Sequence, residues 1–546
     1  MRVQNTLSGR KEEFHPRDPG RVSIYVCGVT PYSDTHVGHA RPSIFWDVVR
    51  RFLRTKGYRV LLVQNFTDVD DKIIARSVRE GVPAVELARR FSEEYLEAMD
   101  LLAVERADVY PRVSGHIPAI IEVVGGLVSE GHAYVLDGDV YYDVSKFPSY
   151  GKLSKQRLED LESGARVEVD ERKRSPLDFA LWKAAKSGEP AWDSPWGKGR
   201  PGWHIECSAM SLKYLGDGFD FHGGGVDLIF PHHENEMAQS EAYTGRIPFV
   251  RYWLHNGLLN MSKEKMSKSL GNFVTVKDLT RRFPAQAIRV FMLSTHYRSP
   301  IDFDEARLEE AARGWQRLEE TRGSLRHFLE ASGRGPDEFP GGEAVLLVSE
   351  SEAGECLGST PEEKEFEAFL HQTTDKFISG MEDDFNTAIA LASLFELCRR
   401  ANAFRDWLSP QVSVPGTSVT LLGRALGLLE GLGAGVLGVI SEQERGGSGG
   451  LRQGPGPGSS AQTVMEPAGP GGPPHESGSP SGDGAATLAG RLVKVMVEMR
   501  QEARRLKDWA AADLIRDRLA EAGVLLEDTP QGTRWKLDSR SAGRGI

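Results

Sequence analysis

The sequence predicts an α/β protein built from parallel βαβ units, with an insertion between two halves, then an α-helical bundle and a small C-terminal α+β module. Three observations support this fold class. A β-rich apolar run, a Gly/Pro loop, a helical segment and a second β-rich run follow one another near the N-terminus. An irregular stretch separates this unit from a second αβ pattern. From residue 305, apolar residues recur at helical spacing.

The first half of the α/β domain is expected in residues 1–110. Residues 22–26 form a β-rich apolar run, and the loop at 27–33 contains a glycine and a proline. A helix is expected from about Val37. A second strand is expected at 59–65, one helix later, which is the order of a βαβ unit.

Composition divides the rest of the chain. Residues 446–484 are dominated by Gly, Pro and Ser, which cannot bury enough apolar surface to order a chain, so we expect a flexible linker there. The expected domains are the first half of the α/β domain, a connective insertion, the second half, a helical bundle, the linker and a compact α+β module, at residues 1–110, 111–201, 202–304, 305–440, 441–487 and 488–546.

The overall composition is that of a soluble protein. The 546 residues are 40% hydrophobic and 27% charged, with a net charge of −11. No apolar run approaches the roughly 20 residues that span a bilayer, and the N-terminus lacks a signal-peptide pattern, so we expect a cytoplasmic protein. Four cysteines are too few for a disulfide framework, and reduced thiolates are open to metal binding: Cys27, Cys207, Cys356 and Cys398.

Two segments far apart in the sequence indicate a site for nucleotide phosphates. His36, Gly38 and His39 fall at the predicted strand-to-helix turn, where imidazoles can donate to phosphate oxygens and the helix N-terminus adds positive potential. Lys265 and Lys268 lie three residues apart in Lys-Met-Ser-Lys-Ser and can neutralise a pyrophosphate leaving group.

A glycine run lies between these segments. Gly223, Gly224 and Gly225 precede Asp227, whose carboxylate can accept hydrogen bonds from ribose hydroxyls. Each signal has an ordinary alternative: a chance His-x-Gly-His, a solvated Lys/Ser loop, and a tight glycine turn. Their combination in this order favours adenylation chemistry.

A second set of residues suggests a metal site. His232 and Glu236, four apart on a predicted helix, share one face. With Cys27 and Cys207 they form a donor set suited to Zn²⁺. Spacing alone leaves the site open, because no Cys-x-x-Cys pair is present. A metallopeptidase is disfavoured because no His-Glu-x-x-His occurs. Neighbouring residues offer other combinations: His204, Glu206, His233 and Glu234.

The two phosphate motifs, HVGH and KMSKS, resemble those of the class I aminoacyl-tRNA synthetases. The resemblance implies a Rossmann-like class I catalytic domain that aligns a carboxylate with the α-phosphorus of ATP, accompanied by Mg²⁺, without an obligatory general base. It implies catalytic roles for His36, His39, Lys265 and Lys268. The implied ATP-binding residues are His36, Gly38, His39, Gly224, Asp227, Lys265 and Lys268.

Within that class, the chain resembles the cysteinyl-tRNA synthetases over residues 25–28, 202–210, 222–227 and 231–240. Thr67 and Trp203 match positions that line the amino-acid pocket of that family, although core packing is the alternative for Trp203. Zinc prefers sulfur to the hydroxyl of serine, which makes a separate editing site unnecessary. The resemblance implies that one Zn²⁺ binds the substrate thiolate and is held by Cys27, Cys207, His232 and Glu236.

The helical region and the tail resemble the same family, which implies tRNA(Cys) as a partner beside L-cysteine and ATP. Residues 491–546 carry 12 Lys and Arg against 9 Asp and Glu, a local positive balance that suits RNA. Trp535 could stack on an unpaired base and Arg534 could bond its edge or a phosphate. For Trp535 core packing is an equal alternative, and for Trp509 it is the favoured one. We expect a monomer.

Two other functions remain open from the sequence. A ligase of the mycothiol type would adenylate cysteine in the same way and pass it to an amino-sugar, but such enzymes lack an anticodon module. A non-catalytic tRNA-binding paralogue is the other alternative. The presence of both HVGH histidines, both KMSKS lysines and all four proposed metal ligands disfavours it.

Overall fold

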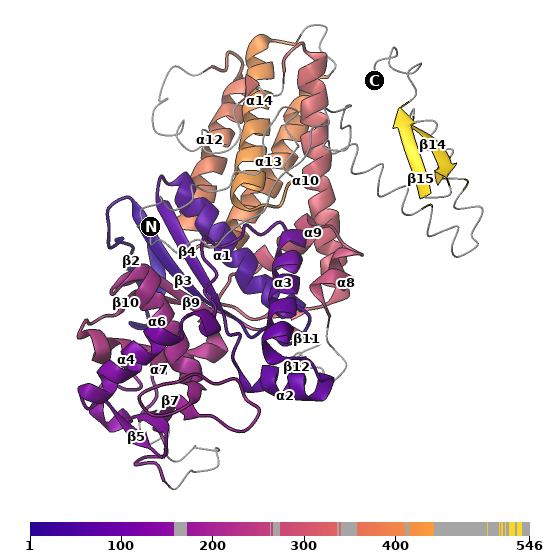
Figure 1. Cartoon of the computed structure of the whole chain (residues 1–546). Coiled ribbons are helices and arrows are strands. Elements are labelled where there is room, and N and C mark those ends of the chain that lie inside the picture. The colour runs from indigo at the N-terminus through magenta and orange to yellow at the C-terminus, as the bar shows by residue number, and fades with distance from the viewer. Residues whose placement is uncertain are drawn as a thin grey trace, which may run out of the picture. The chain divides into compact units, whose positions relative to one another are not determined.

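The computed structural model describes two compact units, Met1–Gly446 and Gly447–Ile546 (Figure 1). In the first unit it describes residues 1–157, 172–261, 264–265, 274–335, 338–339, 357–409 and 414–441. In the second it describes 500, 513, 515–516, 519, 524–529 and 532–537. The predicted linker therefore lies outside the described residues, apart from position 441.

A four-stranded parallel sheet forms the centre of the first unit, in the order β10-β9-β3-β4. Helix α1 (Val37–Thr55) connects β3 to β4, and α7 (Glu234–Thr244) connects β9 to β10 (Figure 1). The predicted α/β fold class is confirmed, and α1 begins at the expected residue. The strands are β3 (Arg21–Val29), β4 (Arg59–Phe66), β9 (Phe219–Gly225) and β10 (Val250–Asn256).

Two hydrophobic cores cover the two faces of this sheet. Side chains of α1, including Ile44, Val48 and Phe52, pack on the face that carries Ile24 and Leu254. Side chains such as Cys207 pack on the opposite face. Because strand residues alternate between faces, the sheet separates α1 from the helices α4 (Ile117–Ser129) and α6 (Trp203–Leu215).

The stretch expected to be an insertion contains a second sheet, which is antiparallel, in the order β5-β6-β7-β8. It also contains α4, a helix of 13 residues that the sequence analysis, which expects an irregular stretch here, does not predict. Residues 108–112 first run beside β4 through isolated bridges before α4 begins. The strands are β5 (Ala133–Leu136), β6 (Asp139–Tyr142), β7 (Phe179–Ala184) and β8 (Gly199–Pro201).

The remaining elements of the N-terminal region flank the sheet. Strands β1 (Arg2–Asn5) and β2 (Arg10–Glu13) form an antiparallel pair. Helices α2 (Asp71–Glu80) and α3 (Ala84–Leu101) follow β4. After β10, three short strands form a separate sheet: β11 (Leu259–Met261), β12 (Glu264–Lys265) and β13 (Ile301–Phe303), with α8 (Val276–Thr280) and α9 (Ala285–Leu293) between the last two.

Four long helices stand side by side beyond the sheet (Figure 1). The stretch Gly416–Val436 is long and apolar enough to cross a membrane by length and composition, and the sequence reading missed it. Of its most apolar window, 72% is buried, as in the core helix of a bundle. The helices are α10 (Glu305–Ala331), α12 (Pro361–Glu382), α13 (Thr387–Leu408) and α14 (Gly416–Glu430).

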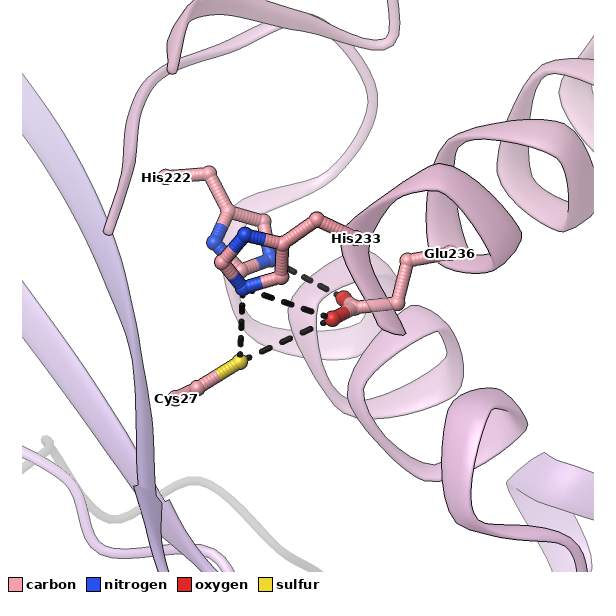
Figure 2. A group of neighbouring side chains, drawn as sticks. All are labelled: Cys27, His222, His233 and Glu236. Atoms are coloured by element: carbon pink, nitrogen blue, oxygen red, sulfur yellow. Dashed lines mark hydrogen bonds and ion pairs between the residues drawn. The ribbon is translucent and has the colours of Figure 1, made fainter. Parts of the chain in front are cut away.

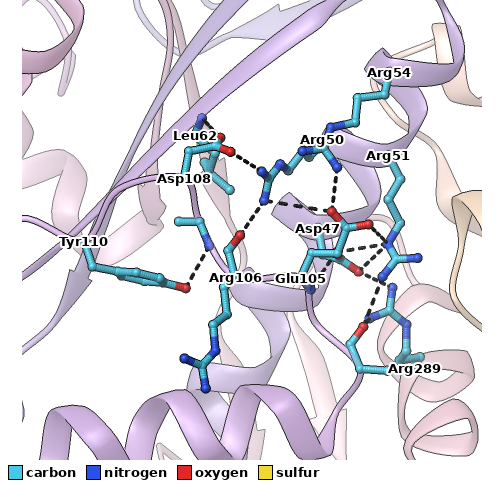
Figure 3. A network of polar contacts seen from close by, with 12 residues as sticks. Asp47, Arg50, Arg51, Arg54, Leu62, Glu105, Arg106, Asp108, Tyr110 and Arg289 are labelled. Atoms are coloured by element: carbon cyan, nitrogen blue, oxygen red, sulfur yellow. Dashed lines mark hydrogen bonds and ion pairs between the residues drawn. The ribbon is translucent and has the colours of Figure 1, made fainter. Parts of the chain in front are cut away.

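A buried ion pair joins α9 to α1, and its arginine also bonds the chain that follows the helical region (Figure 3). Arg289 of α9 contacts Asp47 of α1 at 2.6 Å, and both side chains are fully buried. Arg51 contacts the same carboxylate at 3.0 Å. Arg289 also donates to the carbonyl of Leu437, just beyond α14. Removing one partner of such a pair typically costs about 3–5 kcal/mol, so the end of the bundle is firmly held to α1.

In the second unit, β14 (Val524–Thr529) and β15 (Gly532–Leu537) form an antiparallel hairpin. The predicted α+β module therefore contains two paired strands. Most residues of the predicted tail helices lie outside the described residues, and so does Trp509.

Candidate metal centre and nucleotide-binding edge

His36 and His39 lie at the N-terminus of α1, at the carboxyl edge of the central sheet. His36 is the N-cap residue, and its Nδ1 accepts a hydrogen bond from the Gly38 amide at 3.1 Å. The two imidazole rings stack with centroids 3.7 Å apart. A Cβ on Gly38 would lie 2.8 Å from the His36 ring, so glycine is required for this approach.

The protonation of His39 follows from its surroundings. Desolvation first, and then the neighbouring His36, lower the pKa of His39 well below its usual value. His39 is therefore neutral near pH 7. A neutral imidazole can still donate one N–H, and His39 lies in the first turn of α1, where the helix N-terminus adds positive potential.

The glycine run ends β9 at the same edge of the sheet. A Cβ on Gly223 would lie 2.0 Å from the Trp46 ring, and one on Gly224 would lie 2.7 Å from the ring of His233. Close packing therefore requires glycine at both positions, whether or not a ligand binds there. Asp227 follows in an exposed 3₁₀ turn (Val226–Leu228).

The segments that flank the KMSKS pentapeptide lie against the HVGH segment. Val37 donates to the carbonyl of Val274 at 3.0 Å, and Val276 donates to the carbonyl of Thr35 at 2.9 Å. Lys265 lies in β12, where its backbone pairs with Asn260. Lys268 lies outside the described residues. The described residues that follow the pentapeptide therefore lie beside the HVGH motif, at the start of α1.

The four proposed metal ligands come together from four elements. Cys27 comes from β3, Cys207 from α6, His232 from a π turn (Ile229–His233), and Glu236 from α7. Their ligand atoms all lie within 4.8 Å of one another. The two Sγ atoms are 3.8 Å apart, and His232 Nε2 lies 2.8 Å from Glu236 Oε1. Two sulfurs bound tetrahedrally at about 2.3 Å from Zn²⁺ lie about 3.8 Å apart.

The charges within this cluster suit a divalent cation. A hydrogen bond from Cys27 outweighs burial and lowers the pKa of Cys207 to about 6, whereas burial raises the pKa of Cys27. Burial lowers the pKa of His232, but Glu236 outweighs it and raises that pKa to about 10. Burial raises the pKa of Glu236, but His222 and His232 hold it well below its usual value. One thiolate and one carboxylate therefore stand ready as ligands.

A second ligand combination shares two of these residues (Figure 2). Cys27, His222, His233 and Glu236 also have ligand atoms within 4.8 Å of one another. His222 Nε2 lies 2.9 Å from Glu236 Oε2, and His233 Nε2 lies 3.2 Å from Cys27 Sγ. The sequence reading did not select His222, although it stands directly before the glycine run.

A chain of hydrogen bonds fixes His233 from behind. Its Nδ1 lies 2.7 Å from Nε2 of His255, whose Nδ1 lies 2.8 Å from Thr6 Oγ1. The ring of His222 stacks on Trp253 with centroids 4.5 Å apart. His222 Nε2 bonds Glu236 and His233 Nδ1 bonds His255, so both imidazoles are held in place beside Cys27 and Glu236.

The two residues matched to the amino-acid pocket have different surroundings. Trp203 is 41% exposed, so the alternative of core packing is wrong. Its ring stacks on His232 with centroids 4.4 Å apart. Thr67 is buried directly after β4 and accepts a hydrogen bond from Asn65 at 3.3 Å. Asn65 in turn accepts from the amide of Gly28, which follows Cys27.

The proposed RNA contacts lie in the second unit. The backbones of Arg534 and Trp535 belong to β15 and pair with Glu527 and Leu526 of β14. The surroundings of their side chains lie outside the described residues.

Comparisons with known proteins agree along the whole chain. The family described as tRNA synthetases class I (C) catalytic domain matches residues 13–313. The DALR domain matches 376–441, and the cysteinyl-tRNA ligase anticodon binding domain matches 494–535.

Individual relatives cover nearly the full length. The cysteine–tRNA ligase of Pelotomaculum thermopropionicum is 52% identical over 98% of this chain and 99% of its own. That of Desulforudis audaxviator is 49% identical over 98% and 100%.

Solved structures share the fold at low identity. A methionyl-tRNA synthetase of Mycobacterium tuberculosis has a TM-score of 0.54 and 18% identity, over 74% of this chain and 88% of its own. A LeuRS–tRNA–LeuAMS complex of Agrobacterium radiobacter has a TM-score of 0.57 and 11% identity, over 78% and 85%. With full-length relatives near 50% identity and matches from the catalytic domain to the anticodon-binding domain, the chain belongs to the cysteine–tRNA ligase family of class I aminoacyl-tRNA synthetases.

Proposed function

We propose that this chain activates L-cysteine with ATP, forming cysteinyl-adenylate and pyrophosphate, and then transfers cysteine to the 3′ end of tRNA(Cys), releasing AMP. The observation that carries the proposal is the meeting of two thiols, an imidazole and a carboxylate within 4.8 Å, at the sheet edge where the HVGH helix begins. Thiol selection and nucleotide binding then occur side by side.

The residues present fit a zinc ion. Cys27, Cys207, His232 and Glu236 would hold it, because of the two ligand combinations among the described residues this one contains both sulfurs, and their 3.8 Å separation equals that of a tetrahedral site. When bound, Zn²⁺ supplies a soft Lewis acid that prefers the thiolate of cysteine to the hydroxyl of serine. Thr67 and Trp203 would form walls of the amino-acid pocket, Trp203 through its stack on His232.

Adenylation in this proposal rests on positioning and electrostatics. His36 and His39 bind phosphate oxygens at the N-terminus of α1. Gly224 and Asp227 approach the nucleoside, with Asp227 accepting from the ribose. Lys265 and Lys268 neutralise the departing pyrophosphate, and Mg²⁺ accompanies ATP. No side chain needs to act as a general base, since the attacking group is the ionised carboxylate of cysteine.

The tRNA would contact the helical region, 305–440, and the C-terminal module, 488–546, with 441–487 as a tether. Arg534 and Trp535 are the proposed RNA contacts. The match to an anticodon-binding domain at 494–535 disfavours the mycothiol-type ligase, which needs no such module. We further propose that the protein is a cytoplasmic monomer, and that the domain boundaries inferred from the sequence apply.

The test is cysteine-dependent ATP–pyrophosphate exchange, combined with metal analysis by mass spectrometry. We expect about one zinc per chain in the wild-type protein, exchange with cysteine but not serine, and loss of both zinc and exchange in Cys207→Ser.

Cys398→Ser is the matched control, because this buried cysteine lies in α13 of the helical region. It should retain zinc and activity. A purified wild-type protein that contains zinc but shows no exchange would refute the proposed function.

A further inference from the structure

We infer that Arg41 is a positioning residue for adenylation. By bonding four backbone carbonyls, it clamps the base of the KMSKS hairpin, formed by β11 and β12, to α1, the helix that begins within HVGH. The inference rests on the proposed function and adds a residue that the nucleotide motifs do not contain. Arg41 lies in α1, two residues after His39, and is 3% exposed.

The guanidinium of Arg41 reaches two chain segments at once. Its Nη1 donates to the carbonyls of Gly257 and Leu258, at 2.8 and 3.0 Å. Its Nη2 donates to the carbonyls of His296, at 3.2 Å, and Ser299. Burial lowers the pKa of Arg41 only to about 10, so the group stays charged near pH 7. Hydrogen bonds from a charged donor are stronger than those between neutral groups.

Both clamped segments lead directly into the KMSKS hairpin and its support. Leu258 immediately precedes β11, and Asn260 of β11 pairs with Lys265 of β12. Ser299 precedes β13, which pairs in parallel with β11. The carbonyl of Leu258 accepts from Ile301 as well as from Arg41. The position of Lys265 relative to the HVGH helix is therefore set through a short, hydrogen-bonded path.

The backbone packs tightly at the clamp. A Cβ on Gly257 would lie 2.5 Å from the carbonyl oxygen of Ser299 and 2.6 Å from that of Arg298. Any larger residue at 257 would push the two segments apart. Gly257 and Arg41 therefore act at the same place, because Gly257 packs against the carbonyl of Ser299 and Arg41 donates to it.

The segment that follows the pentapeptide is tied to the same helix independently. Thr35 and Val37, on either side of His36, exchange backbone hydrogen bonds with Val276 and Val274. Both ends of the segment that carries Lys265 and Lys268 are therefore anchored on the start of α1. The backbone anchors one end, whereas the other depends on the Arg41 side chain.

The effect of the clamp should be specific to the nucleotide step. The proposed zinc ligands Cys27 and Cys207 pack with the core on the face of the sheet opposite α1. A displaced hairpin would misplace the lysines that meet the leaving pyrophosphate, while leaving the thiol site intact. Misplacement of catalytic groups by about 1 Å costs on the order of 10²-fold in rate.

The test compares Arg41→Met, Arg41→Lys and Gly257→Ala with the wild type. We expect adenylation to slow on the order of 10²-fold in Arg41→Met and less in Arg41→Lys, which keeps the charge but not the fork. Zinc content and the KM for cysteine should not change. Gly257→Ala should produce the same kcat-selective loss, because its Cβ would displace the carbonyl of Ser299 that Arg41 bonds. It therefore tests the inference even if Arg41→Met does not fold.

Arg17 offers a matched control. It also donates to two backbone carbonyls, those of Leu215 and Asp217, but at the opposite end of the sheet. Arg17→Met should adenylate at the wild-type rate. Wild-type adenylation in the Arg41 variants, or a parallel loss of zinc, cysteine affinity and kcat, would overturn the inference. Absence of exchange in the wild type itself would instead refute the proposed function.

Discussion

In the proposed site, the Trp203 side chain would link the metal centre to the substrate pocket, because its ring stacks on His232. Trp203 is partly exposed, and its ring stacks on His232, a proposed zinc ligand. Its ring would cover one side of a bound cysteine without contributing to the core. Glu206 of the same helix is buried, with Oε2 lacking a hydrogen-bond partner among the described residues.

Replacement of Trp203 by alanine should weaken cysteine binding with little effect on folding. An aromatic stack is worth about 0.5–1.5 kcal/mol, so the KM for cysteine in pyrophosphate exchange should rise by up to about tenfold. Trp407→Ala is the control, because Trp407 is 38% exposed in the helical region. Equal cysteine KM values in the two variants would contradict the assignment of Trp203 to the pocket.

At the scale of elements, a buried carboxylate joins the starts of α12 and α14. Glu363 completes a capping box with Thr360 at the N-terminus of α12. It also accepts hydrogen bonds from Thr417 at 2.7 Å and from Ser418 at 2.5 Å, both in α14. Burial raises the pKa of Glu363, but these hydroxyls and Ser359 outweigh it and lower the pKa to about 2. One ionised side chain therefore ties two helices together.

This pKa predicts how acid acts on the bundle. The folded-state pKa lies below the unfolded value of about 4.3, so ionised Glu363 stabilises the fold above that pH by up to about 3 kcal/mol. The contribution is lost as the pH falls from about 4.3 toward 2. Glu363→Gln should lower the free energy of unfolding at pH 7 and flatten its decline over that range in denaturant titrations. Glu362→Gln, on the exposed face of the same turn, should do neither.

At the scale of the whole molecule, the catalytic and helical parts form one compact unit, and the C-terminal module forms another. Within the first unit, the Asp47–Arg289 pair holds the end of the bundle to the helix that begins with the ATP motif (Figure 3). The residues that link the units are rich in Gly, Pro and Ser. This composition predicts a flexible tether, which would keep the module near its partner at an effective concentration set by tether length.

Removal of the second unit should separate the two half-reactions. Deletion of residues 447–546 should leave cysteine-dependent pyrophosphate exchange unchanged, because the first unit has its own core. Charging of tRNA(Cys) should fall sharply. Shortening 446–484 alone should also leave exchange intact. A drop in exchange after either deletion would show that the second unit supports the adenylation site, whereas undiminished product formation would favour a small-molecule acceptor.

The sequence by itself determined the fold class and the chemical identity of the site. The βαβ order follows from local patterns. HVGH, KMSKS and the Cys, His and Glu residues can be recognised in the sequence without knowledge of the fold. Their grouping was reached by resemblance, since spacing left Cys27 and Cys207, 180 positions apart, with several possible partners.

Only the tertiary structure decided which atoms meet. The supports His222, His233 and His255, the exposure of Trp203 and the carbonyl clamp of Arg41 depend on how the parallel strands align their carboxyl ends. Helix α4 escaped sequence reading because its neighbours are rich in turns. Contacts between distant segments arise from sheet order and helix packing, which no local pattern encodes.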